Sequence, residues 1–169
     1  MDAIIQKATE LGAARIVPLL SERVVARLDE EDAARKAMKW RLVAVDAIKQ
    51  CGSAWLPQVE PPQTPGQFLA RKENFELPLI ASLERGSRLA REYFQRFHAH
   101  HGRTPESVCV WIGPEGDFTA AETEAIKSHG ALPITLGPLV LRTETAALYC
   151  LSILNYELQA PFPAELPGR

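Results

Sequence analysis

The sequence SVCVWIGPEG, residues 107–116, decides which kind of fold to expect. Its first six residues form an apolar run, which is typical of a strand buried inside a sheet. The turn GPEG, residues 113–116, follows at once, and Thr119 and Glu122 then form a capping box that begins a helix ended by Gly130. A buried strand, a short turn and a helix in succession indicate an α/β fold.

The same alternation extends outward in both directions. Further strands are predicted over residues 14–20, 77–83 and 132–136. Helices are predicted over residues 2–11, from Asp29 to Gly52, after Gly86, and from Thr143 or Thr145 to about Gln159. Four prolines indicate an irregular link before the strand at 77–83: Pro57, Pro61, Pro62 and Pro65. This order predicts a mostly parallel sheet flanked by helices, with a ligand crevice at the carboxyl ends of its strands.

The composition is that of one globular domain. The 169 residues are 46% hydrophobic and 24% charged, and we expect the domain to span residues 1–160, with a flexible tail over the proline-containing residues 161–169. Because no apolar run approaches the roughly 20 residues of a membrane span and the N-terminus lacks a secretory signal pattern, a cytoplasmic protein is expected. The net charge of -2 argues against gripping nucleic acid by bulk electrostatics alone.

The three cysteines, Cys51, Cys109 and Cys150, lie far apart and include no C-x-x-C pair. Neither a disulfide framework nor a zinc site is therefore indicated, and we interpret them as small core residues. The other patterns that would carry phosphate or dinucleotide chemistry are also missing, because the GPEG turn is neither a phosphate loop nor a G-x-G-x-x-G sequence. Taken alone, that turn is either a ligand cradle or a tight turn with a solvated Glu115.

A second stretch, LGPLVLRTETA over residues 136–146, is unusual for a loop between a strand and a helix. Its apolar residues predict burial, and a buried Arg142 would need a carboxylate, carbonyl or phosphate partner. The alternative is that Arg142 pairs with Glu144 or caps the helix, with Thr143 as an ordinary N-cap.

Together the two stretches resemble the RsmE family of bacterial 16S ribosomal RNA methyltransferases, whose knotted SPOUT domain carries an I-G-P-E-G-G-F loop and an L-G-x-x-x-L-R-x-E-T-A loop. The resemblance extends from about Asp2 to Tyr156 and includes residues 6–12, 21–23, Trp40 and 50–52. Three positions depart from the family pattern. Asp117 stands where the family has a second glycine, and Lys39 and Ser53 each stand where it has an arginine. The family also has an N-terminal PUA-like RNA-binding domain, which we expect to be absent from this sequence.

The resemblance implies a trefoil-knotted α/β domain that binds S-adenosylmethionine in the knot and methylates N3 of a uridine in 16S ribosomal RNA of the small subunit, without a metal. Arg142 and Glu144 are the candidate catalytic residues, and Arg23 and Gln50 are candidate RNA contacts. The candidate cofactor contacts are Ala81, Ser82, Leu83, Ile112, Gly113, Pro114, Glu115, Gly116, Leu136, Gly137, Leu141, Thr143, Thr145 and Ala146.

Two further expectations concern partners. The last helix carries apolar residues at helical spacing, and the resemblance implies that it packs across the two-fold axis of a homodimer: Ala147, Leu148, Leu151, Leu154 and Leu158. Five arginines between residues 85 and 103 form either an RNA footprint or a solvated helix face. Two other functions remain open: ribose 2′-O-methylation of another RNA, and a non-catalytic RNA-binding or ribosome-assembly module.

Overall fold

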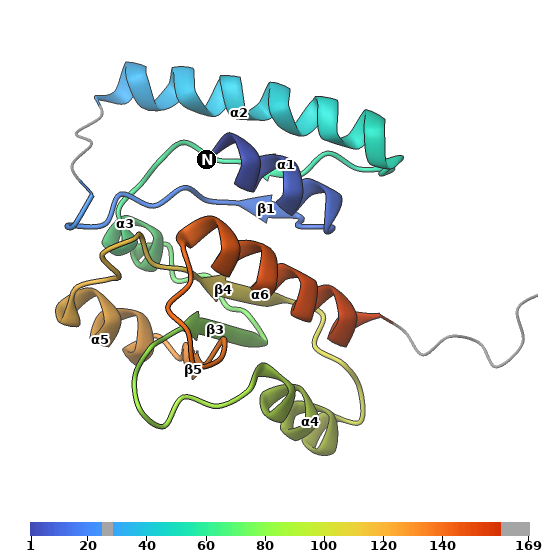
Figure 1. Ribbon diagram of the computed structural model, residues 1–169, viewed down its shortest axis with the longest axis vertical. Helices are drawn as coiled ribbons and strands as arrows, with labels where there is room; N and C mark the ends of the chain where they lie inside the picture. The colour runs from blue at the N-terminus through green and yellow to red at the C-terminus, as the bar shows by residue number, and fades with distance from the viewer. Residues whose placement is uncertain (25–28, 160–169) are drawn as a thin grey trace, which may run out of the picture.

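A computed structural model of the chain describes residues 1–24 and 29–159, in which every paired strand is parallel to its neighbour (Figure 1). Strand β3 (Leu77–Ala81) lies in the centre of a three-stranded sheet, between β4 (Val108–Trp111) and β5 (Leu132–Ile134). A second sheet pairs β1 (Arg15–Ile16) with β2 (Gln58–Val59). The predicted parallel α/β fold is confirmed, with two sheets in place of one. The predicted tail lies outside the described residues.

Capping residues set the ends of several helices. Their bounds are α1 Asp2–Glu10, α2 Glu30–Cys51, α3 Pro65–Ala70, α4 Ala90–His101, α5 Ala120–Ser128 and α6 Thr143–Leu158. Asp29 caps α2 by accepting a hydrogen bond from the backbone of Asp32, and Gly52 ends it in the left-handed conformation at φ 72°. The predicted capping box of Thr119 and Glu122 begins α5.

The prediction of an irregular link over residues 57–65 is wrong in part. It contains β2, and α3 begins inside it at Pro65. Thr64 and Gln67 form a capping box there, and proline at the first helical position lacks only an N–H that would have no partner in the helix. The strand predicted over residues 14–20 is also shorter, since β1 covers two residues and Leu19 adds one isolated bridge to Gln63.

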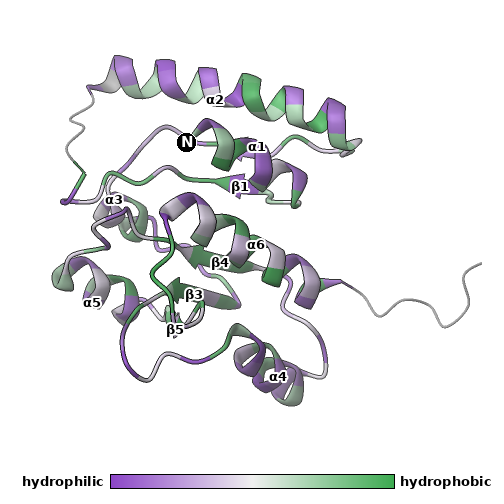
Figure 2. Ribbon diagram, in the orientation of Figure 1, coloured by the Kyte–Doolittle hydropathy of each residue, from purple (hydrophilic) through white to green (hydrophobic). Residues whose placement is uncertain are grey.

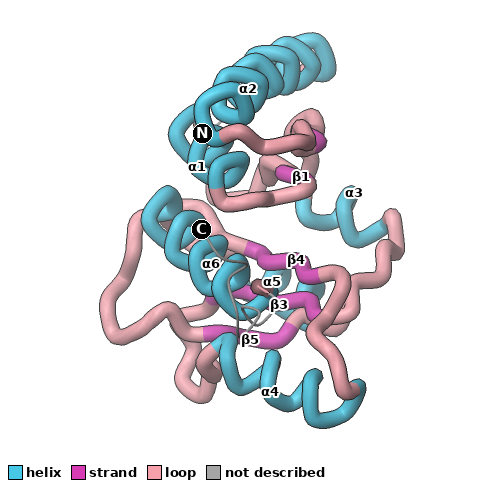
Figure 3. The backbone as a smooth tube through the Cα atoms, turned by 90° about the vertical axis from the view of Figure 1, so that its right-hand side faces the viewer, coloured by secondary structure: helices cyan, strands magenta, loops and turns pink. Residues whose placement is uncertain are grey.

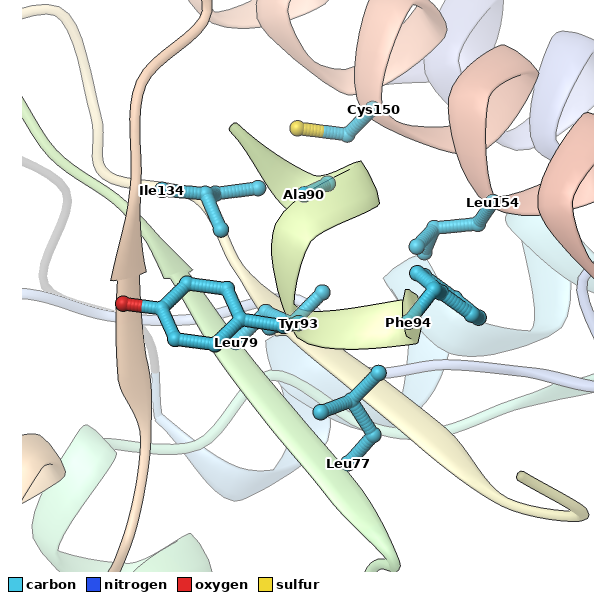
Figure 4. Close-up of a cluster of buried hydrophobic side chains, with 8 residues drawn as sticks. All are labelled: Leu77, Leu79, Ala90, Tyr93, Phe94, Ile134, Cys150 and Leu154. Carbon is cyan, nitrogen blue, oxygen red and sulfur yellow. The ribbon is translucent and has the colours of Figure 1, made fainter. Parts of the chain in front are cut away.

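The three-stranded sheet is covered on both faces. On one face α4 and α6 pack against β3 and β5 through a cluster shown in Figure 4: Leu77, Leu79, Ala90, Tyr93, Phe94, Ile134, Cys150 and Leu154. On the other face α3 and α5 pack through Phe68, Ile80, Trp111, Phe118, Ile126 and Ala131. Alternate residues of β3 serve opposite faces, as the two-residue period of a strand requires.

The N-terminal third forms a layer of its own beside α6. Figure 3 shows α1, α2 and β1 together in this layer. A small core of Ile5, Trp40 and Ala44 lies within it, and Ile16 of β1 and Val59 of β2 pack against that core. The side chain of Asn155 in α6 donates a 3.1 Å hydrogen bond to the carbonyl of Leu11, which ties this layer to the larger one.

The cysteines only partly follow the expectation that they are core residues. Cys150 is buried, and burial raises the pKa of its thiol to about 12. Cys109 is half-buried, and the same cause raises its thiol pKa to about 11. Cys51 is the last residue of α2 and is exposed, so the prediction is wrong there.

Candidate functional site

A pocket lies where β3, β4 and β5 end. Parallel strands bring their carboxyl ends to one edge of the sheet, so the segments that follow them meet there. The space between its walls is about 550 Å³, and part of that space is open to solvent. Its lining residues are Ala81, Ser82, Leu83, Ile112, Gly113, Pro114, Glu115, Asp117, Leu136, Gly137, Leu139, Val140, Leu141, Thr143 and Ala146.

The first wall is the turn after β4, which closes tightly on itself. The backbone N–H of Asp117 donates to the carbonyl of Pro114 at 2.8 Å, with Asp117 in the left-handed region at φ 59°. Its Oδ1 accepts a 2.8 Å hydrogen bond from the N–H of Phe118. A Cβ at Gly113 would lie 2.5 Å from that oxygen. The same Cβ would lie 3.2 Å from both the Cα of Asp117 and the N of Phe118, so glycine fits position 113 best.

The second wall is the apolar loop from β5 to α6, visible as a green segment in Figure 2. The prediction that this loop is buried is wrong for Leu139 and Val140, which are 72% and 77% exposed. The loop runs along the rim of the pocket, and only Leu136 and Leu141 are half-buried. Within the part of the chain that the structure describes, the N–H groups of residues 139–141 have no hydrogen-bond partner.

The two walls are joined at the start of α6. The Thr143 hydroxyl donates to the carbonyl of Gly113 at 3.3 Å. Helix α6 begins at Thr143, as predicted, and its N-cap is Arg142, so the alternative that Thr143 is the N-cap is wrong. A threonine at the first helical position contacts the other loop instead.

Arg142 and Glu144 stand beside the pocket without lining it. Both side chains are exposed, which corrects the expectation of a buried arginine. Among the described residues neither has an ion-pair partner, and they do not pair with each other. An exposed guanidinium at the rim needs no internal partner because water solvates it.

Arg23 reaches the first loop from the N-terminal layer. Its guanidinium donates a hydrogen bond to the carbonyl of Gly116. The segment is anchored by Glu122, which accepts from the Ser21 hydroxyl at 2.9 Å and from the N–H of Glu22 at 3.0 Å. Burial of Glu122 opposes its ionisation, but hydrogen bonds from Thr119, Glu22 and Ser21 together lower the pKa of this carboxyl.

Most of the predicted site residues are brought together. All predicted cofactor contacts line the pocket except Gly116 and Thr145, which are exposed beside it. Asp117, Leu139 and Val140 line it without having been predicted as contacts, although each adjoins a predicted residue. Gln50 is exposed in the last turn of α2, at the opposite end of the molecule from the start of α6 (Figure 1). The roles of these residues remain predictions.

The arginines around α4 are largely engaged in ion pairs. Arg88 pairs with Glu92 at 3.4 Å, Arg91 with Glu157 at 3.0 Å and Arg103 with Glu76 at 2.5 Å. Of the five, only Arg85 and Arg96 lack a carboxylate partner in residues 1–24 and 29–159. The solvated-face alternative therefore accounts for three of them.

The described residues contain neither a cluster of metal ligands nor a membrane-spanning helix. No group of three or more histidine, cysteine, aspartate or glutamate side chains there could hold a metal ion. No described helix is both long enough and apolar enough to cross a membrane.

A parallel sheet with helices on both faces and a pocket at its carboxyl edge defines an α/β ligand-binding domain. The chain belongs to the RNA methyltransferase domain family, whose model matches residues 1–155. It is 34% identical to the ribosomal RNA small subunit methyltransferase E of Bacillus subtilis, over 94% of this chain and 62% of the relative. The corresponding protein of Synechocystis is 30% identical, over 94% of this chain and 50% of its own length.

Solved structures give the same result. A methyltransferase of Legionella pneumophila in complex with S-adenosylmethionine matches with a TM-score of 0.82 and 38% identity, over 92% of this chain and 60% of that one. The ribosomal RNA small subunit methyltransferase E of Neisseria gonorrhoeae, bound to S-adenosylmethionine, matches with a TM-score of 0.76 and 29% identity. The match covers 92% of this chain and 60% of that one. The RsmE resemblance and the SPOUT class are thus confirmed, and the chain spans roughly 50 to 62% of the length of these relatives.

Proposed function

We propose that this chain is the catalytic domain, over residues 1–160, of an S-adenosylmethionine-dependent methyltransferase acting on N3 of a uridine in 16S ribosomal RNA. The observation that carries the proposal is the pocket itself. It is framed by the two loops whose sequences resemble the RsmE pattern, and the Thr143 hydroxyl links them. The same proposal implies a cytoplasmic protein, because its substrate belongs to the ribosome.

The residues present fit this cofactor. The apolar side chains of Leu83, Leu136 and Leu141 can pack against an adenine ring. The N–H groups of residues 139–141, which have no hydrogen-bond partner among the described residues, can bind its polar edge. Glu115 and Ser82 offer oxygens to ribose hydroxyls or to the amino acid portion. When bound, S-adenosylmethionine supplies a methyl group activated by a cationic sulfonium.

The chain's own residues must hold the uracil base and favour loss of its N3 proton. N3 of uridine is on the pairing edge, so the base must be unpaired or flipped before it enters. Loss of the N3 proton leaves negative charge on the uracil carbonyl oxygens, which a fixed cation can stabilise. Arg142 is exposed at the rim and free of ion pairs among the described residues, and we assign it this role, with anchoring of an RNA phosphate as the competing one. Glu144, one helical position beyond Thr143, is available to orient Arg142 or to accept a cofactor hydroxyl.

We also propose a homodimer formed by α6 and the apolar loop. Ala147 and Leu154 face the core of the chain, and Leu148 and Leu151 are half-buried. An apolar surface remains uncovered on the loop and on α6: Leu139, Val140, Tyr149, Tyr156 and Leu158. Tyr149 and Tyr156 are two helical turns apart and therefore share one face, which suits an isologous interface. A solution mass equal to that of the monomer alone would contradict this part of the proposal.

The activity is tested in two steps. Calorimetry with S-adenosylmethionine measures cofactor binding, and a chain that binds none is an RNA-binding or assembly module instead of an enzyme. Methyl transfer to purified small subunits, followed by mass spectrometry of the nucleosides, then distinguishes N3-methyluridine from a 2′-O-methylated ribose. The proposal requires N3-methyluridine.

A further inference from the structure

The charged side chains that line the pocket are all acidic. Two carboxylate side chains line it, Glu115 and Asp117, and no lysine, arginine or histidine is among the described lining residues. Arg23 and Arg142 lie next to lining segments, but the Arg23 guanidinium is bound to the carbonyl of Gly116 and the Arg142 side chain is exposed. The N-terminal end of α6 adds only a partial positive charge at Thr143.

Asp117 is the better fixed of the two carboxylates. Its backbone is held by the bond to Pro114, and its Oδ1 is held by the N–H of Phe118. The side chain is half-buried, whereas that of Glu115 is exposed. Asp117 also lines a second hollow, together with residues 80–84 and Thr123. It therefore forms a wall shared by two hollows, and no described cation pairs with it.

We infer that Asp117 makes this pocket selective for a positively charged ligand. The inference rests on the proposed function and deepens it. The methyl donor carries a sulfonium, whereas S-adenosylhomocysteine, its demethylated product, has a neutral thioether at the same atom. A fixed negative charge attracts the first without attracting the second. Asp117 occupies the position at which the RsmE pattern has a glycine, so the selectivity is a property of this chain's own loop.

The expected size follows from Coulomb's law. A carboxylate several ångströms from a cation, at an effective dielectric constant between those of protein and water, changes a dissociation constant by about three- to tenfold. Glu115 contributes less, because water and salt screen an exposed charge.

The experiment is calorimetric titration of S-adenosylmethionine, S-adenosylhomocysteine and an analogue with an amine in place of the sulfonium. Asp117→Asn keeps the shape and the oxygen that accepts from Phe118, whereas Asp117→Gly restores the residue of the family pattern. Asp46→Asn, on the 79% exposed side chain of Asp46 in α2, removes the same charge far from the pocket. Thermal unfolding of each variant checks that the fold is retained.

Asp117→Asn and Asp117→Gly are expected to weaken binding of both cationic ligands by about three- to tenfold and to change binding of S-adenosylhomocysteine by less than about twofold. Asp46→Asn should leave all three affinities unchanged. If the Asp117 variants lost affinity equally for the cationic ligands and for S-adenosylhomocysteine, or lost none, the ratio of these affinities would be unchanged. That result would overturn the inference while the proposed function stands. A wild-type chain that binds neither S-adenosylmethionine nor its product would overturn the proposed function itself.

Discussion

The guanidinium of Arg23 donates a hydrogen bond to the carbonyl of Gly116, so the N-terminal layer directly supports the loop that forms one wall of the pocket. The support is anchored, because Ser21, two residues earlier, is bound to Glu122 at the start of α5. A residue that the RsmE resemblance implies to be an RNA contact therefore also has a structural partner within the chain. Both roles can be separated experimentally.

Replacing Arg23 by alanine removes the donor to Gly116. We expect the affinity for S-adenosylmethionine to fall by about three- to tenfold, since one charge-assisted hydrogen bond to the loop is lost. Isothermal titration measures the effect, with Arg35→Ala on the exposed face of α2 as the control. Unchanged cofactor affinity combined with weaker binding to small subunits would instead assign Arg23 to RNA contact alone.

Gly113→Ala is expected to disturb the first wall. The added methyl group would lie 2.5 Å from Oδ1 of Asp117, so that side chain must move. Cofactor binding should weaken by at least about tenfold, and adding Asp117→Gly should restore part of it. Gly66→Ala is a matched control, because the nearest atom to its Cβ is 4.0 Å away. If Gly113→Ala bound cofactor normally, the close packing of this turn would not matter for the site.

Arg142→Ala addresses the proposed catalytic role. We expect methyl transfer to small subunits to fall by about a hundredfold, because the developing charge on the uracil loses its stabilising cation. Cofactor affinity should stay within about twofold, since Arg142 is outside the pocket lining. Arg41→Ala, exposed on α2, controls for the loss of a positive charge. Transfer at the wild-type rate would remove Arg142 from the mechanism and leave the family assignment intact.

The pH dependence of stability should depend on an ion-pair network beneath β1. The buried carboxylate of Glu60 binds Arg71 at 2.5 Å, and this hydrogen bond keeps the pKa of Glu60 below its ordinary value of 4.5 despite burial. Glu73 is bonded to Arg15, which lowers the pKa of that carboxyl as well. A group with a lowered pKa stabilises the fold above its unfolded-state pKa and loses that contribution as the pH falls through the folded-state pKa.

The free energy of unfolding should therefore be constant near neutral pH and decrease as the pH falls below about 4.5. Glu60→Gln should lower it by about 2 kcal/mol at pH 7 and flatten its decline in acid. Urea titrations across this range measure both effects, with the exposed Glu124→Gln as the control. An identical acid slope in Glu60→Gln and wild type would contradict the assignment.

The sequence predicted best those features that depend on local chemistry. Asp29 and Gly52 bound α2, and Thr119 and Glu122 begin α5, because caps act within a few residues. The loops at residues 113–116 and 136–146 were predicted to lie together. The RsmE resemblance implies this, and parallel strands place their carboxyl ends at the same edge of a sheet. Helix α3 was missed because Pro65 was interpreted as a breaker, although proline at a first helical position fits a helix.

The burial of the apolar loop could not be judged from composition. Hydrophobic residues at Leu139 and Val140 predict a covered surface, but the sequence does not say whether the same chain, a ligand or a second chain provides the cover. The place of Asp117 was also not predictable, since its packing against Gly113 depends on a left-handed backbone conformation that glycine usually adopts.

The central position of β3 has a consequence for how the protein is made. Both strands that pair with β3 follow it in the sequence, β4 at residue 108 and β5 at residue 132. During synthesis β3 therefore leaves the ribosome with both edges unpaired, and its backbone hydrogen bonds wait for segments translated later. Pairing between such distant segments slows folding, so this domain should fold late, only after most of the chain has emerged.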